Sequence, residues 1–223
     1  MSFLQSYDLI LFDFDGLLVN TEHLHFQAYQ VMCAKRGVFL EWDFMQYCQR
    51  AHTSSDGIQK EIYRCYPALY QQEPHWAVLY EEKKKAYQAL LISQGVQLMP
   101  GVADLLEQIQ TKNIRSVVVT NSFLEQIKQI RQQISLLEAI PYWVTREDYE
   151  KSKPAPDPYL TALKKYKKPQ DRVIGFEDTL RGWQALSKAG LKGVVVSNYL
   201  TPEQKESFHG MGVECVASFL QLL

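Results

Sequence analysis

Five short runs of apolar, mostly β-branched residues recur along the chain, and stretches with helical periodicity separate them. The runs are continuous in apolar character, which is typical of strands that are buried on both faces of a parallel sheet. The predicted strands lie within residues 7–12, 114–121, 142–145, 171–178 and 192–197. Strands that alternate with helices predict a parallel sheet with right-handed crossovers.

The segment from Val19 to Gln94 interrupts this alternation, because it contains helical patterns and no strand pattern. In its first helix, apolar residues recur at Leu24, Ala28, Val31 and Met32. Such a length of helix between two strands is too long for a simple crossover. We therefore predict an α/β fold with a Rossmann-like parallel sheet core, residues 1–18 and 95–223, and an inserted α-helical cap domain, residues 19–94.

The composition is that of an ordinary globular protein. The 223 residues are 46% hydrophobic and 22% charged, with a formal net charge of −1, which gives no overall attraction to nucleic acid or to an anionic membrane. No run approaches the roughly 20 apolar residues of a membrane span, and the N-terminus has no secretory pattern. Four scattered cysteines without a CxxC pair indicate reduced thiols. We expect a cytoplasmic protein.

The first predicted strand ends in an acidic pair. LILF runs directly into Asp13 and Asp15, and Gly16 follows them. If the strand continued, its alternation would place both carboxylates on one face. Two like charges at the end of an apolar strand need a proton or a cation to be tolerated. The pair therefore predicts a cation site or a catalytic site.

Polar residues also follow the other predicted strands. They are Thr120, Asn121 and Ser122 after the second strand, Lys153 in the loop after the third, and Glu177 and Asp178 at the end of the fourth. Each group alone has an ordinary explanation as a helix cap, a loop or a solvated side chain. Ligands bind at the carboxyl ends of the strands in open α/β sheets, so the groups together indicate one functional site.

In this order, the four segments resemble the motifs of the haloacid dehalogenase superfamily of phosphotransferases, in the branch with a helical cap inserted after the first motif. DFDGLLVNTE looks like motif one, TNS like motif two, KPAPDPY like motif three and GFEDTLRG like motif four. The resemblance covers essentially the whole chain. In detail it is to the β-phosphoglucomutases and to small-molecule phosphatases such as phosphoglycolate phosphatase.

The resemblance implies a role for each acid. Asp13 would be the nucleophile that forms an aspartyl-phosphate, and Asp15 the general acid and then the general base. Mg²⁺ would be bound by the carboxylate of Asp13, the backbone carbonyl of Asp15 and the carboxylates of Glu177 and Asp178. The second acid argues against the dehalogenase branch, which has no alcohol to protonate.

The resemblance also implies a phosphate site. Thr120 and the backbone after it would donate hydrogen bonds to phosphate oxygens, which adds Asn121 and Ser122 to the substrate-binding residues. Lys153 would supply a compact positive charge. Gly16 would let the chain turn away close to the phosphate.

The predicted cap decides between a phosphatase and a mutase. Thr21 and His25 can share one helix face, and a matching histidine occurs in the mutases; a half-buried helical histidine is the alternative interpretation. Arg50 matches the first of two basic residues that hold the second phosphate in the mutases, but Ser54 stands where the second one, an arginine, should be. This loss favours a phosphatase.

The sequence therefore predicts a Mg²⁺-dependent phosphatase that hydrolyses a small phosphorylated metabolite, either a sugar phosphate or a phosphoglycolate-like acid. A β-phosphoglucomutase-type mutase is the alternative, and a non-catalytic binding module is a third hypothesis that the retained acids disfavour. We expect no nucleic-acid or membrane partner, and a monomer or weak dimer. The lysines at 83–85 are predicted to form a solvated helix face.

Overall fold

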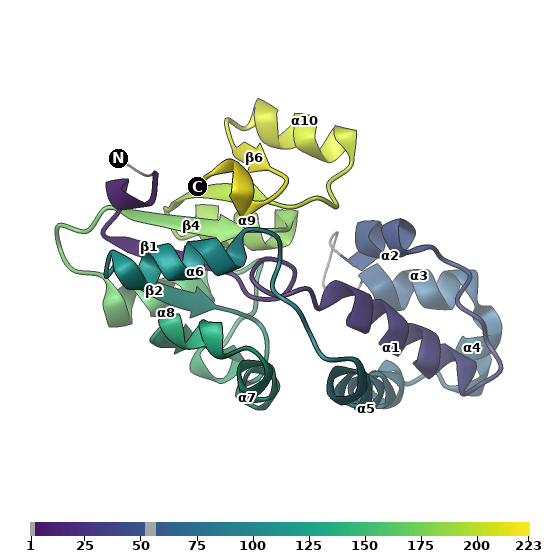
Figure 1. Cartoon of the computed structure of the whole chain (residues 1–223). Helices are drawn as coiled ribbons and strands as arrows, with labels where there is room; N and C mark the ends of the chain where they lie inside the picture. The colour runs from purple at the N-terminus through teal and green to yellow at the C-terminus, as the bar shows by residue number, and fades with distance from the viewer. Residues whose placement is uncertain (1–2, 52–56) are drawn as a thin grey trace. The chain divides into compact units, whose positions relative to one another are not determined.

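The chain folds into two compact units in a computed structural model that describes residues 3–51 and 57–223 (Figure 1). The sheet unit comprises Met1–Asn20 and Gln97–Leu223, and the helical unit comprises Thr21–Val96. Both boundaries lie two residues beyond those expected from the sequence.

The sheet unit contains a parallel sheet of six strands in the order β3-β2-β1-β4-β5-β6 (Figure 1). The strands are β1 (Leu9–Phe12), β2 (Arg115–Val119), β3 (Tyr142–Val144), β4 (Val173–Glu177), β5 (Lys192–Val196) and β6 (Glu214–Val216). The order reverses at β1, which pairs with both β2 and β4. The predicted α/β parallel fold is confirmed. Strand β6 is an addition to the five predicted strands.

Both faces of the sheet are buried, which explains the continuous apolar runs. Leu9 and Leu11 belong to a cluster with Tyr159 and Leu186, and the alternation of β1 turns Phe12 to the opposite face, where its ring stacks on Phe176. The helices of this unit are α6 (Val102–Thr111), α7 (Leu124–Gln133), α8 (Asp157–Tyr166), α9 (Leu180–Lys188) and α10 (Pro202–Gly210). Short 3₁₀ helices lie at η1 (Phe3–Ser6), η2 (Ser135–Ala139), η3 (Arg146–Asp148) and η4 (Phe219–Gln221).

Two glycines let α9 pack closely against the sheet. Gly175 of β4 and Gly193 of β5 are neighbours in register. A Cβ atom would lie 1.8 Å from Leu186 Cδ1 at position 175, and 2.4 Å from Leu186 Cδ2 at position 193. The paired glycines therefore form the space that the Leu186 side chain fills.

We predict that Gly175→Ala lowers the free energy of unfolding by about 1–3 kcal/mol, because the added methyl group overpacks the contact with Leu186. Chemical denaturation measures the change. Adding Leu186→Ala should recover part of the loss, since the two residues share one space. Equal stability of Gly175→Ala and the wild type would contradict this packing.

The described part of the helical unit is built of helices. They are α1 (Glu22–Ala34), α2 (Phe44–Ala51), α3 (Gly57–Cys65), α4 (Pro67–Gln72) and α5 (Trp76–Gln94). Arg36 and Glu82 form an ion pair in which Nη2 donates to Oε1 at 2.8 Å. Of the predicted apolar face of α1, Leu24, Ala28 and Met32 are buried, but Val31 is 39% exposed.

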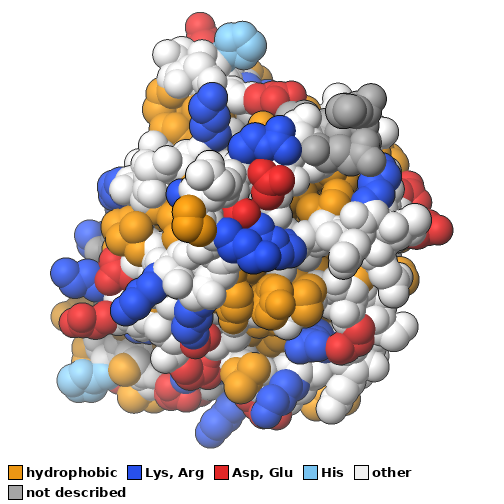
Figure 2. All heavy atoms as spheres, turned by 90° about the vertical axis from the view of Figure 1, so that its left-hand side faces the viewer, with side chains coloured by type: hydrophobic (Ala, Val, Ile, Leu, Met, Phe, Trp, Pro, Cys, Tyr) orange, Lys and Arg blue, Asp and Glu red, His pale blue; other side chains and the backbone are white. Residues whose placement is uncertain are grey.

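Charged side chains of both signs are interspersed over the molecular face in Figure 2, in keeping with the net charge of −1. Among the described residues, no helix combines the length and the apolar character that crossing a membrane requires.

Candidate active site

The first acidic pair lies in a tight loop rather than in the strand. β1 ends at Phe12, and the next backbone N–H, that of Asp13, donates to the Phe176 carbonyl at 3.0 Å. The chain then turns back: Gly16, at φ +80°, donates its N–H to the Val19 carbonyl at 2.9 Å. The strand alternation assumed for Asp13 and Asp15 therefore does not apply, and the two carboxylates have different neighbours.

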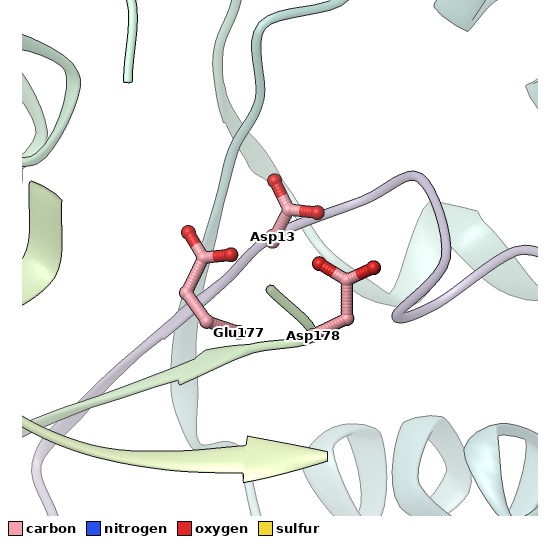
Figure 3. Close-up of side chains that lie close together, drawn as sticks. All are labelled: Asp13, Glu177 and Asp178. Atoms are coloured by element: carbon pink, nitrogen blue, oxygen red, sulfur yellow. The ribbon is translucent and has the colours of Figure 1, made fainter. Parts of the chain in front are cut away.

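Asp13, Glu177 and Asp178 form what we call the acidic cluster (Figure 3). Asp13 follows β1, while Glu177 and Asp178 lie at the end of the neighbouring strand β4, so the parallel register brings them together. One carboxylate oxygen from each residue lies within 4.8 Å of the others, and all three residues are buried. Carboxylate oxygens are the ligands that Mg²⁺ prefers.

Lys153 lies beside the acidic cluster. Its Nζ is 2.5 Å from Asp13 Oδ1 and 2.7 Å from Glu177 Oε1, and it donates to the Val119 carbonyl at 2.7 Å. Although burial disfavours the ammonium, the two carboxylates raise the pKa of Lys153 above its ordinary value, so it remains charged. Its backbone leads into a cis peptide bond with Pro154.

The charges of this group fit a divalent cation. Lys153 supplies one positive charge against the three carboxylates of the acidic cluster. Burial raises the pKa of Glu177 to about 7 and Asp13 adds to the shift, whereas Lys153 opposes it. A bound divalent ion would balance the remaining negative charge and favour the ionised form of each acid.

The carboxylate of Asp15 lies outside the acidic cluster and accepts hydrogen bonds from the region after β2. Ser122 Oγ donates to Asp15 Oδ2 at 2.5 Å, and Thr120 Oγ1 does so at 3.5 Å. Gln126 Nε2, on α7, lies 3.4 Å from Asp15 Oδ1. This separation agrees with different tasks for the two acids; the expected metal contact of Asp15 uses its backbone carbonyl and stays a prediction.

Asn121 connects the loop after β2 to the loop that carries Lys153. Its Oδ1 accepts the Lys153 backbone N–H at 3.3 Å and lies 2.8 Å from the Tyr149 hydroxyl. The same hydroxyl is 2.8 Å from the Thr120 carbonyl. In this structure Asn121 therefore organises the two loops, and substrate binding by Asn121, Ser122 or Gly16 stays a prediction.

In the helical unit, His25 and Lys83 form a polar pair inside a group of tyrosines. Lys83 Nζ lies 2.7 Å from His25 Nδ1, and the His25 ring stacks on Tyr87 with centroids 4.2 Å apart. The same ammonium lies 5.0 Å from the centroid of the Tyr29 ring. The prediction that Lys83 is solvated was wrong, because α5 turns it inward to 5% exposure. Thr21, just before α1, accepts the His25 N–H through its carbonyl at 3.0 Å.

We predict that His25 stays neutral down to acidic pH. His25 is half-buried, and the loss of solvent around its ring, followed by the Lys83 ammonium, lowers its pKa from 6.5 to about 3, against a smaller opposite effect of Glu22. Because the unfolded chain then binds more protons between these values, the stabilisation associated with His25 is lost as pH falls through this window. NMR titration of the ring tests this directly, and Lys83→Met should raise the pKa. A titration midpoint of His25 near pH 6.5 in the wild-type protein would contradict its pairing with Lys83.

Arg50 is held by neighbours within the helical unit. Its Nη1 donates to the Gln46 carbonyl at 2.7 Å, and its Nε lies 3.5 Å from Glu61 Oε2. The guanidinium carbon is 4.6 Å from the centroid of the Trp42 ring. Ser54 lies outside the described residues, so the comparison of this segment with the mutases stays a prediction, as do the substrate roles of Thr21, His25 and Arg50.

A parallel sheet whose strand order reverses beside a buried group of carboxylates and a lysine defines an α/β enzyme with a site at the carboxyl ends of β1 and β4. The chain matches the haloacid dehalogenase-like hydrolase family over residues 10–196, and it belongs to this family. The family and the enzyme class expected from the motifs are thereby confirmed.

Relatives of known sequence and structure extend this comparison. Protein CbbY of Cereibacter sphaeroides is 30% identical over 211 residues, 91% of this chain and 89% of its own. The phosphorylated carbohydrates phosphatase of Thermotoga maritima is 25% identical over 194 residues, 84% and 83% of the two chains. A CbbY variant from Rhodobacter sphaeroides, solved in complex with xylulose-(1,5)bisphosphate, superposes with a TM-score of 0.74 at 26% identity, covering 97% of this chain and 96% of its own.

Proposed function

We propose that this protein is a Mg²⁺-dependent phosphatase that hydrolyses a small phosphorylated metabolite through an aspartyl-phosphate on Asp13. The observation that carries the proposal is the buried acidic cluster, with Lys153 Nζ 2.5 Å from Asp13 Oδ1. Two relatives support the substrate class: one is a phosphatase of phosphorylated carbohydrates, and another is a CbbY variant bound to a sugar bisphosphate. A sugar phosphate is therefore the first candidate, and a phosphoglycolate-like acid the second.

In the first step, an Asp13 carboxylate oxygen attacks phosphorus and the bond from phosphorus to the sugar oxygen breaks. Asp15 transfers its proton to the departing oxygen, so the product leaves as an alcohol. Ser122 and Thr120, which donate to the Asp15 carboxylate here, are free to turn to phosphate oxygens once Asp15 is protonated. Lys153 orients the Asp13 carboxylate for the attack.

In the second step, Asp15 takes a proton from a water molecule, whose oxygen attacks phosphorus of the aspartyl-phosphate. The bond from phosphorus to Asp13 breaks, and inorganic phosphate and a free Asp13 carboxylate result. Covalent catalysis thus divides one difficult displacement into two displacements that use the same acids.

The acidic cluster provides the carboxylates that would hold Mg²⁺, together with the Asp15 backbone carbonyl. A bound Mg²⁺ ion supplies positive charge that offsets the charge of the phosphoryl group and of the acids around it. We further propose that the helical unit, Thr21–Val96, acts as the substrate-determining cap.

A panel of phosphate esters tests the proposed function. Purified protein is incubated with hexose and pentose monophosphates and bisphosphates and with phosphoglycolate, with Mg²⁺ or with EDTA. We expect release of inorganic phosphate from at least one sugar phosphate, and no release in EDTA. Interconversion of hexose 1- and 6-phosphates without net phosphate release would identify a mutase instead. No reaction with any ester would favour the binding module.

A further inference from the structure

Tyr159 joins the hydrophobic core to the acidic cluster. The residue lies in α8, is fully buried, and packs among Leu9, Val119 and Leu186 of the core. Its hydroxyl nevertheless reaches the end of β4, where it hydrogen-bonds to Glu177 Oε1. A phenol is neutral at ordinary pH, so the Tyr159 hydroxyl donates this hydrogen bond and the carboxylate accepts it.

The Tyr159 hydroxyl and Lys153 Nζ converge on a single oxygen of Glu177. Lys153 Nζ lies 2.7 Å from the same Oε1 atom and 5.0 Å from the centroid of the Tyr159 ring. The ring therefore contacts the ammonium, while the hydroxyl shares its acceptor. Two donors on one carboxylate oxygen fix both the rotation and the position of the Glu177 side chain.

Gly182 of α9 leaves room for the Glu177 carboxylate because it has no side chain. A Cβ atom at position 182 would lie 1.8 Å from Glu177 Oε2 and 2.7 Å from Oε1. The backbone there is itself held, because the Gly182 N–H donates to Thr179 Oγ1 at 3.1 Å in the N-terminal cap of α9. Glu177 thus lies between a donor on α8 and a side-chain-free position on α9.

We propose that Tyr159 is a positioning residue of the metal site: its hydroxyl, acting with the space left by Gly182, fixes Glu177 in the acidic cluster for Mg²⁺ binding. This inference rests on the proposed function and deepens it. Groups that orient metal-binding side chains commonly contribute 10- to 100-fold to metal affinity. A tyrosine retained only for core packing would contribute through its ring and not through its hydroxyl.

Tyr159→Phe separates these two roles, because it keeps the ring and removes the donor. The dissociation constant for Mg²⁺ is measured by isothermal titration calorimetry on the whole protein without substrate. We expect it to rise by about tenfold or more. In the phosphatase assay, the Mg²⁺ concentration for half-maximal activity should rise likewise, and kcat should largely recover at saturating Mg²⁺.

Tyr166→Phe is the matched control. Tyr166 ends the same helix, and its ring stacks on Tyr142 with centroids 4.6 Å apart, away from the acidic cluster. This variant should bind Mg²⁺ like the wild type. Wild-type Mg²⁺ affinity in Tyr159→Phe would overturn the inference and leave the proposed function standing. A wild-type protein that does not bind Mg²⁺ would overturn both.

Gly182→Ala tests the same placement from the opposite side and serves if Tyr159→Phe folds poorly. The new methyl group must displace the Glu177 carboxylate, since its position is 1.8 Å from Oε2. We expect a larger increase in the Mg²⁺ dissociation constant than for Tyr159→Phe, with helix α9 retained because alanine favours helix. Unchanged Mg²⁺ affinity in Gly182→Ala would contradict the proposed placement of Glu177.

Discussion

Asp13→Asn is expected to reduce phosphatase turnover by on the order of 10⁶-fold, as loss of a covalent nucleophile does in other enzymes. The amide cannot form the phosphoryl intermediate, although it nearly matches the carboxylate in size. The fold should persist, because Lys153 keeps its ion pair with Glu177 at 2.7 Å. Phosphate release under saturating Mg²⁺ measures the loss, and circular dichroism with thermal unfolding checks the fold.

Asp104→Asn provides the control for Asp13→Asn. Asp104 is an exposed acid in the first turn of α6 and has no part in the acidic cluster. The Asp104→Asn variant loses the same negative charge as Asp13→Asn, and its turnover should be unchanged. Turnover of Asp13→Asn near that of the wild type would disprove the assignment of the nucleophile.

Asp15→Asn should lower turnover of a sugar phosphate by about 10³-fold, because the departing alkoxide then lacks a proton donor. p-Nitrophenyl phosphate should behave differently, since nitrophenolate leaves without protonation. With this ester we expect a burst of about one nitrophenolate per enzyme followed by slow turnover, because the variant still lacks the base for the second step. Rapid-mixing absorbance measurements resolve the two phases.

The contrast between the two esters is what tests the role of Asp15. The same loss with both, and no burst, would mean that Asp15 supports the site without transferring protons. Ser122→Ala is a useful companion, because it removes the donor 2.5 Å from Asp15 Oδ2 while leaving the acid in place. Release of nitrophenolate by Ser122→Ala should show no burst, because Asp15 is still present as the base of the second step.

The sheet could be predicted because burial on both faces leaves a clear pattern. Leu11 and Phe12 point to opposite faces and both are fully buried, so the strand is apolar at every position. The sixth strand, Glu214–Val216, escapes this criterion: it has three residues, and they are exposed or half-buried. A short edge strand depends on pairing with β5, which the sequence does not encode locally.

The acidic cluster could be predicted from the sequence, because its members lie at the ends of neighbouring strands. The residues that surround the cluster could not be predicted in this way. Tyr159, Tyr149 and Gln126 reach the site from helices and loops whose packing places them there, and no spacing rule connects them to Glu177, Asn121 or Asp15. KPAPDPY contains Tyr159, but the motif does not indicate that its hydroxyl bonds to an acid.

Lys83 shows that a sequence pattern can also give a wrong prediction. Three successive lysines suggest solvent, yet α5 gives them different environments: Lys83 is buried and Lys85 is exposed. The helical period places Lys83 on the same face as Leu79 and Tyr87, and packing in the helical unit buries that face. The pairing with His25 Nδ1, which makes burial of the ammonium tolerable, becomes visible only when α1 and α5 are packed together.

Trapping the phosphoryl group on the enzyme tests the central claim most directly. Wild-type protein is mixed with a sugar phosphate that it hydrolyses and with Mg²⁺, quenched in acid within milliseconds, and digested for peptide mass spectrometry. The mechanism predicts one phosphoryl group on Asp13, which is absent when EDTA replaces Mg²⁺. Release of phosphate with no phosphoryl group on Asp13 at any quench time, or with the group on another residue, would contradict it.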